Sequence, residues 1–271
     1  DCEYWSLEQA KLGKGAPPKF QGKIVMITGG SGTIGFAIAE AFSKLGAQTV
    51  LVDKDETTLK KAITKLGHGH GYFPIDVTEA DAANQAMLAA IQKFGGLDIL
   101  VSNAGAAHAG PMLSISNDEL RSAFELNFFS HYSFSTAAAK ILKNQNRGGQ
   151  ILFNISKQAV NPGRNFGAYG LPKATTFFLM RQLALELGSD GIRVNGVNAD
   201  RIRSGLLTDD FISSRAKSRG VSESEYMAGN LLGKEVTAEH VADAFTSLAC
   251  AESTTGHVMT VDGGNVEASL R

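Results

Sequence analysis

Two side chains four residues apart, Tyr169 and Lys173, have the types and spacing to exchange a proton with a substrate oxygen. Residues at this spacing share one face of a helix. A tyrosine with an ordinary pKa near ~10 is a poor base at neutral pH, but a neighbouring ammonium group favours its phenolate form. The spacing predicts a general acid/base pair, although Tyr–Lys neighbours are also common on helix surfaces. Because proline is tolerated in the first helical turn, Pro172 indicates that the pair lies at a helix start.

Ser156 and Asn127 are two polar residues that would complete this proton-handling site. Ser156 lies thirteen residues before Tyr169, just after an apolar run, and its hydroxyl would bind the substrate oxygen; the alternative is a serine that caps a turn. Asn127 stands among leucine and phenylalanine in a helical pattern, where a buried amide must find partners. We predict that Asn127 holds a water that links Lys173 to solvent, the alternative being a satisfied core asparagine.

A second candidate site lies in segment 28–35, which reads Thr-Gly-Gly-Ser-Gly-Thr-Ile-Gly. Glycines between a strand and a helix let the backbone approach a pyrophosphate, which the helix N-terminus binds. Such a turn is weak evidence alone, but a strand precedes it, a helix follows, and Asp53 ends the next strand. A carboxylate there accepts from the adenosine ribose and repels a ribose phosphate. We therefore predict NAD rather than NADP, although Lys54 softens the repulsion and Asp53 has an alternative role in the turn.

Two further strand ends extend the predicted cofactor site. Asp76 and Val77 follow the third strand, and residues 103–105 follow the fourth. The carboxyl ends of parallel strands share one edge of the sheet, so these loops should meet the same ligand. The site comprises Gly29, Ser31, Gly32, Thr33, Ile34, Gly35, Asp53, Asp76, Val77, Asn103, Ala104 and Gly105. No histidine or cysteine cluster has metal-ligand spacing, so no metal is predicted.

The elements that position these residues follow from alternating apolar runs and helix-length segments. The predicted strands are 23–28, 48–53, 71–75, 97–102, 150–155, 193–197 and 257–261, and the predicted helices 34–45, 57–66, 79–94, 118–143 and 168–187. Several runs are nearly continuous in Val, Ile and Leu, as in strands covered on both faces. The alternation predicts an α/β fold with a Rossmann-type, doubly wound, seven-stranded parallel sheet and helices on both faces.

Two segments depart from this alternation. Residues 1–19 read as a short helix and a linker. The polar stretch 204–233, interrupted by Gly220 and Gly229, is either a lid over the substrate or an ordinary surface excursion.

The composition excludes several classes of protein. A chain of 271 residues with 43% hydrophobic and 20% charged residues is typical of a soluble α/β protein. The net charge of -1 gives no basic field for nucleic acid, and no apolar run approaches the ~20 residues of a membrane span. Cys2 and Cys250 alone do not indicate a disulfide framework, which favours a cytoplasmic location.

Taken together, these residues resemble the short-chain dehydrogenase/reductase family over residues 20–271. The resemblance assigns the family's tetrad to Asn127, Ser156, Tyr169 and Lys173. It implies that Tyr169 and Lys173 also contact the cofactor, and that Asn103 anchors it. It further implies that Ile202 and Ser204 contact the nicotinamide carboxamide.

The sequence departs from the family pattern at three places. Thr33 replaces the middle glycine of the turn, and Ala199-Asp200 replaces the usual Pro-Gly. If Asn154 matches the asparagine common in that strand, Lys157 takes the place of the serine. Ser156 is preferred, because a lysine cannot share the donor and acceptor role of a hydroxyl.

Three longer strings, at 3–12, 198–207 and 226–232, resemble bifunctional aldolase/short-chain dehydrogenases. In that family an N-terminal aldolase domain cleaves rhamnulose 1-phosphate, and the C-terminal domain is assigned lactaldehyde or alcohol dehydrogenase activity. The resemblance implies that 1–19 is the joint to an aldolase domain, that lactaldehyde is the substrate, and that the domain forms a homodimer or homotetramer. The alternatives are a sorbitol- or ribitol-type polyol dehydrogenase, or a catalytically silent dinucleotide-binding module.

Overall fold

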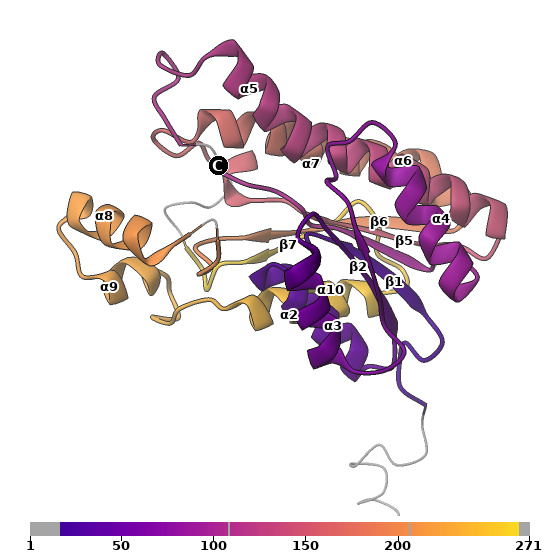
Figure 1. Ribbon diagram of the computed structural model, residues 1–271. Helices are drawn as coiled ribbons and strands as arrows, with labels where there is room; N and C mark the ends of the chain where they lie inside the picture. Colours follow the sequence, from indigo (N-terminus) through magenta and orange to yellow (C-terminus); the bar gives the residue numbers. More distant parts are fainter. Residues whose placement is uncertain (1–16, 108, 206, 266–271) are drawn as a thin grey trace, which may run out of the picture.

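Seven parallel β-strands form the centre of the protein, in the order β3-β2-β1-β4-β5-β6-β7 (Figure 1). They are β1 (Ile24–Thr28), β2 (Gln48–Asp53), β3 (Gly71–Pro74), β4 (Ile99–Ser102), β5 (Gly149–Asn154), β6 (Ile192–Ala199) and β7 (Val258–Val261). The predicted doubly wound parallel sheet is confirmed. Its order reverses between β1 and β4, and ligands of such sheets bind outside the carboxyl ends of the strands at that point.

This computed structural model describes residues 17–107, 109–205 and 207–265. The short helix predicted near the start of the chain lies outside the described residues. Within the described part of the chain, no helix has the length and apolar character needed to cross a bilayer.

Helices cover both faces of the sheet (Figure 1). One layer holds α2 (Thr33–Lys44), α3 (Glu56–Leu66) and α10 (Ala238–Cys250), and the other holds α4 (Ala82–Phe94), α6 (Ser130–Gln145) and α7 (Gly167–Leu187). Each layer buries its own apolar core, one around Phe42 and Phe245 and the other around Phe134 and Phe153. Both faces of the strands are therefore covered, which explains their nearly continuous apolar sequences.

The helix predicted at 118–143 is divided into three pieces. The short helix α5 (Asn117–Phe124) begins at a capping box of Ser116 and Glu119. A π-helical turn, η1 (Glu125–Phe129), then connects it to α6. The wider turn lets the Asn127 carbonyl accept a hydrogen bond from Thr176 Oγ1 of α7 at 2.7 Å. Such turns are frequent at functional sites, and this one holds a residue of the predicted tetrad.

The segment 204–233 forms two short helices, α8 (Asp209–Arg219) and α9 (Glu223–Met227). They project beyond the carboxyl ends of the strands at the left of Figure 1. A small apolar cluster that includes Ile212 and Tyr226 holds the two helices together. The apolar contacts of this segment are thus mainly between its own two helices.

Candidate active site

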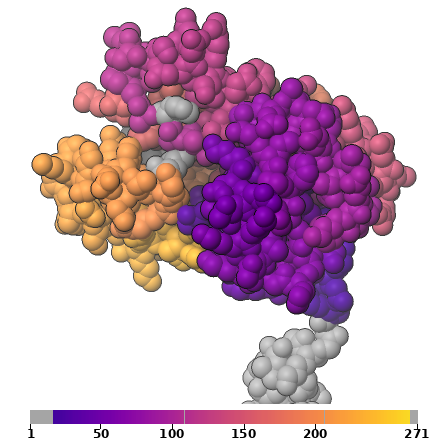
Figure 2. All heavy atoms as spheres, in the orientation of Figure 1, coloured from indigo at the N-terminus to yellow at the C-terminus, as the bar shows by residue number. Residues whose placement is uncertain are grey.

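A cleft of about 1540 Å³ opens at the carboxyl ends of the strands. In the space-filling view the molecule is hollowed between the orange surface of α8 and α9 and the magenta surface around α5 (Figure 2). Most of the predicted residues line this cleft: Gly29, Gly32, Ile34, Gly35, Asp53, Asp76, Val77, Asn103, Ala104, Gly105, Ser156, Tyr169, Lys173, Ile202 and Ser204. Ser31, Thr33 and Asn127 are not among the lining residues.

The glycine-rich turn after β1 is shaped for a close ligand. Gly29 has a φ of +62°, and a β-carbon on Gly35 would lie 2.1 Å from the Gly29 carbonyl oxygen. No side chain caps the start of α2 at Gly32, so its backbone donors remain for an anion. Thr33 replaces the family's middle glycine. It is exposed and does not line the cleft. The turn therefore fits a dinucleotide pyrophosphate.

Two carboxylates mark the opposite end of the cleft from Tyr169. Asp53 Oδ2 accepts hydrogen bonds from Ser31 Oγ at 2.7 Å and from Ser31 N at 3.2 Å. Ser31 thus acts on the site through Asp53 rather than by lining the cleft. Asp76 Oδ1 accepts from Thr78 N and Oγ1, and the backbone bond is the main cause that lowers the Asp76 pKa. Both side chains are held in fixed orientations by these hydrogen bonds, and their predicted contact with the adenosine of a dinucleotide stays a prediction.

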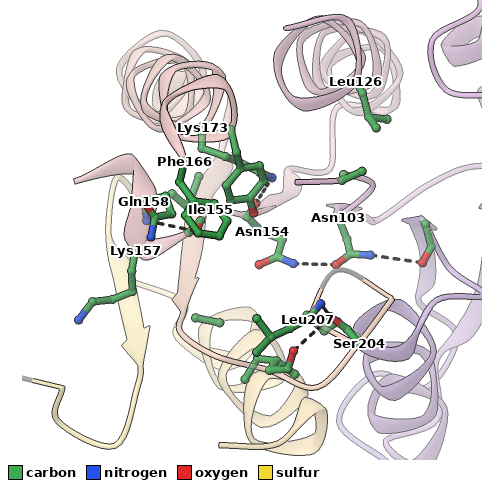
Figure 3. Close-up of a pocket in the computed structure, with 18 of the residues that line it drawn as sticks. Asn103, Leu126, Asn154, Ile155, Lys157, Gln158, Phe166, Lys173, Ser204 and Leu207 are labelled. Carbon is green, nitrogen blue, oxygen red and sulfur yellow. Dashed lines mark hydrogen bonds between the residues drawn. The ribbon is translucent and has the colours of Figure 1, made fainter. Parts of the chain in front are cut away.

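Asn103 joins three strand ends beneath the cleft. Its Nδ2 donates to the Thr28 carbonyl at 2.9 Å, and its Oδ1 accepts from Asn154 Nδ2 at 2.8 Å (Figure 3). Thr28 Oγ1 in turn accepts from the backbone N–H groups of Asn103 and Ala104. The network fixes β1, β4 and β5 relative to one another. Sequence analysis gave Thr28 and Asn154 no such role, although both are polar residues at the ends of apolar strands.

Tyr169 lies in the first turn of α7, with 8% of its surface exposed. The Ser156 side chain lowers the pKa of the Tyr169 phenol, which supports the choice of Ser156 over Lys157. Burial raises the pKa of the Tyr169 phenol, and the Ser156 hydrogen bond offsets only part of this effect. Burial alone thus favours the phenol, and the expected effect of Lys173 and of a cationic nicotinamide on the phenolate stays a prediction. Pro172 lies in the second turn of α7, not the first as predicted.

Lys173 is buried, with 2% of its surface exposed, and its ammonium group faces the cleft (Figure 3). Its Nζ donates to the Asn154 carbonyl at 2.9 Å and lies 5.9 Å from the Tyr169 ring centre. Burial lowers the pKa of Lys173 to about 7. The amine therefore changes charge near neutral pH, as a group in a proton relay must.

His131 is a contact of Lys173 that the sequence analysis missed. Its Nε2 lies 3.3 Å from Lys173 Nζ, and its Nδ1 lies 2.6 Å from Ser102 Oγ. Burial first, and then the Lys173 charge, holds the His131 pKa well below its usual value. The imidazole is thus neutral, with Nε2 free to accept from Lys173 and Nδ1–H donating to Ser102. The position of His131 one helical turn after Asn127 is the feature of the sequence that could have predicted this contact.

Asn127 is fully buried behind the cleft, where its amide is satisfied by backbone groups. Nδ2 donates to the Ala106 and Ala123 carbonyls at 2.9 and 3.1 Å, and Oδ1 accepts from Ala106 N at 3.2 Å. A β-carbon on Gly105 would lie 2.8 Å from Asn127 Oδ1 and 3.5 Å from Lys173 Nζ. Both polar groups therefore border the same space beside Gly105. The predicted water relay between them stays a prediction.

Lys157, the alternative to Ser156, points away from Lys173 (Figure 3). Its buried ammonium pairs with Asp262, which follows β7. On the same side, Asp200 Oδ2 accepts from Asn265 Nδ2 at 2.6 Å. The Ala199-Asp200 departure thus has a structural role, because it anchors the segment after β7.

Ile202 and Ser204 lie in the loop after β6 and line the cleft, as the resemblance implies. Ser204 Oγ donates to the Ile202 carbonyl at 3.1 Å and accepts from Leu207 N at 3.3 Å. These bonds hold the loop at the cleft edge, and the predicted contact of both residues with a carboxamide stays a prediction.

The glycine turn, the cleft and the Ser156–Tyr169–Lys173 arrangement define an NAD(P)-dependent oxidoreductase. A family model described as enoyl-(acyl carrier protein) reductase matches residues 29–265. The chain belongs to the short-chain dehydrogenase/reductase family, and it is an NAD(P)-dependent enzyme of that family. The silent dinucleotide-binding module is therefore not favoured.

Relatives within this family act on varied compounds. The chain is 34% identical to the oxidoreductase YuxG of Bacillus subtilis, over 99% of this chain and 41% of that protein's length. It is 30% identical to (+)-borneol dehydrogenase 1 of Salvia officinalis, over 91% of this chain and 94% of the relative. A 3-ketoacyl-(acyl-carrier-protein) reductase of Brucella melitensis, solved in complex with NADH, has a TM-score of 0.83 at 26% identity, covering 91% of this chain and 99% of that one.

Proposed function

We propose that the protein is an NAD-dependent dehydrogenase of a small hydroxy-aldehyde or alcohol, with lactaldehyde in rhamnose catabolism as the first candidate. The observation that carries the proposal is the convergence of Ser156, Tyr169 and Lys173 at one end of a cleft that has Asp53 at the other. The nicotinamide, when bound, supplies the acceptor or donor of the hydride. The residues of the chain bind the substrate oxygen and move its proton.

Each residue of the site has a separate task in this proposal. The Ser156 hydroxyl donates to the substrate oxygen and orients it towards Tyr169. The Tyr169 phenol gives its proton to that oxygen during reduction, and the phenolate form takes the proton of the substrate hydroxyl during oxidation. Lys173 replenishes the proton from the polar space beside Gly105. For aldehyde oxidation, a hydrated aldehyde presents the same hydroxyl, so no cysteine is needed; the one described cysteine, Cys250, lies on α10.

The substrate proposal is tested by following NADH formation with lactaldehyde, glycolaldehyde, 1,2-propanediol, sorbitol and ribitol. Turnover of lactaldehyde supports the proposal. Turnover of sorbitol or ribitol alone would replace it with a polyol dehydrogenase that uses the same machinery. Measured NADH binding without any turnover would contradict the proposed substrate class.

The preference for NAD is proposed from Asp53, whose carboxylate would accept from a ribose hydroxyl and repel a ribose phosphate. In Asp53→Ala, we expect kcat/KM to fall for NAD and to rise for NADP, each by roughly tenfold, since a hydrogen bond to a charged group contributes about 1.5–3 kcal/mol. Asp55→Ala is the control, because Asp55 caps α3 through Thr57 and Thr58 and does not line the cleft. Equal preference in wild type and Asp53→Ala would contradict the assignment.

We also propose a homodimer or homotetramer, a cytoplasmic location and, in a longer protein, a joint from 1–19 to an aldolase domain. YuxG, of which this chain spans 41%, is long enough for a further domain.

The segment 204–233 is proposed as the lid, because Ser204, Leu207 and Phe211 line the cleft. Free Cys250 is compatible with a reducing compartment.

The oligomer is testable on α7, where Leu171, Phe178 and Leu185 are 47%, 69% and 81% exposed. Their spacing of seven residues places them in one stripe, the pattern of a helix that packs on another helix. Phe178→Asp should reduce the molar mass measured by light scattering to that of a smaller species. Leu88→Asp, on the exposed side of α4, should leave the mass unchanged. A monomeric wild type would refute the proposal.

A further inference from the structure

Three arginines that have no carboxylate partner among the described residues line the cleft. Arg164 comes from the loop after β5, and Arg215 and Arg219 lie one turn apart on α8. Over the described ranges, the salt bridges of this region instead involve Arg201 and Arg203. A cleft that presents uncompensated cations to its ligand favours an anionic ligand.

Arg215 is the most constrained of the three. Its Nε is buried and donates to no acceptor among the described residues. The guanidinium lies 5.8 Å from the centre of the Phe166 ring, which fixes its orientation. The buried Nε is out of reach of a ligand in the cleft, so an anion would be bound by the two terminal nitrogens of the guanidinium, because Arg215 lines the cleft.

The position of Arg215 assigns that anion to the substrate rather than to the pyrophosphate. Phe166, which lies beside Lys173 in Figure 3, accepts a hydrogen bond from Tyr169 N at 3.1 Å. Arg215 is thus beside the start of α7, where the proton is moved. The pyrophosphate turn is the separate loop 29–35 at the start of α2.

The charges beside Arg215 make the substrate end of the cleft more positive. Arg201 and Arg219 lie 4.8 and 5.3 Å from the same Tyr226 ring, and only Arg201 has a carboxylate partner, Asp200. The other carboxylates that line the cleft are those of Asp53 and Asp76 at the adenosine end, and Glu125 of η1. The substrate end therefore carries a positive excess.

We propose that the substrate carries a terminal oxyanion, a phosphate or a carboxylate, and that Arg215 binds it together with Arg219 and Arg164. A guanidinium group offers a planar pair of donors that matches the oxygens of either group. The inference rests on the proposed hydride transfer, because it places the carbinol or carbonyl at Tyr169 and the anion at α8. Within the proposed class of small hydroxy-aldehydes and alcohols, it predicts that derivatives with an anionic terminal group are preferred to neutral compounds such as lactaldehyde.

The test keeps a three-carbon frame constant and changes only the terminal group. Turnover with NAD is measured for 1,2-propanediol, for lactate and for 1,2-propanediol 1-phosphate, in wild type, Arg215→Gln and Lys217→Gln. Lys217 lies on the same helix, is exposed and does not line the cleft, so it controls for the lost charge. We expect kcat/KM for the preferred anion to exceed that of the diol at least tenfold. Arg215→Gln should lower it by roughly 10- to 100-fold through KM.

Binding is measured separately from turnover. Calorimetric titration of the enzyme–NADH complex with glycerol 3-phosphate and glycerate should show binding that is absent with glycerol and lost in Arg215→Gln. If this binding occurs without turnover of any compound, the proposed function fails and the anion site stands. Equal kcat/KM for diol and anions, or an equal effect of Arg215→Gln and Lys217→Gln, would overturn the inference. It is also overturned if Arg215→Gln weakens NADH binding as much as anion binding, because the arginine then holds the cofactor.

Discussion

Tyr169→Phe should lose nearly all turnover, by roughly 10²–10⁴, while its affinity for NADH stays close to that of the wild type. The change removes only a hydroxyl from a buried ring, so the packing of α7 is kept. The lost group is the phenol whose pKa Ser156 lowers, on a residue that lines the cleft. NADH formation under steady-state conditions measures the loss, and NADH fluorescence measures the affinity.

Tyr72→Phe is the matched control, because Tyr72 also loses a hydroxyl but lies on β3 and bonds only Glu56, at 3.4 Å. Its turnover should equal that of the wild type. If Tyr169→Phe retained more than a tenth of wild-type turnover, another group would have to move the proton, and the proposed mechanism would be discarded.

The second large effect is expected for Lys173→Met, which should lose roughly 10²–10³ in kcat. Burial keeps the Tyr169 pKa raised, and the variant has no cation to favour the phenolate. The residual oxidation should therefore increase with pH up to the alkaline range, whereas reduction, which uses the protonated phenol, should depend less on pH. Measuring the rates of oxidation and of reduction as a function of pH checks this difference.

Stability gives a second measurement on Lys173→Met, independent of activity. The Lys173 pKa is about 7 in the folded protein and 10.5 ordinarily, so between these values the unfolded chain binds more protons. The wild-type free energy of unfolding should therefore increase from pH 7 to 10.5 relative to the variant. The variant should be the more stable protein at pH 6, on the order of a few kcal/mol. A pH-independent difference would contradict the depressed pKa.

Local patterns in the sequence predicted most of the elements, because they depend on neighbours along the chain. Apolar runs identified all seven strands. The π turn at Asn127 escaped prediction, since its distinguishing bond reaches Thr176 on another helix. The spacing of apolar residues in the sequence is nearly the same for an α-helix with one inserted residue and for a continuous α-helix.

The residues of the candidate site also divide into those that local patterns predict and those that depend on long-range contacts. The spacing of Tyr169 and Lys173 on one helix face is set by helix geometry, and the glycine turn by the strand and helix beside it. The contact of Lys173 with His131 and the link from Asn103 to Asn154 join residues that are distant in sequence. The spacing of residues carries no information about such pairs.

The sequence by itself determined the parallel sheet, the place of the dinucleotide turn and the acid/base pair, because each rests on a local rule of periodicity or helix geometry. Only the tertiary structure decided how these groups are charged and what surrounds them. Burial raises the Tyr169 pKa and lowers that of Lys173. Packing of α8 beside Phe166 places Arg215 in the lining of the cleft. Desolvation and long-range contact exist only in the packed molecule, which is why the chemistry of the site depends on the fold.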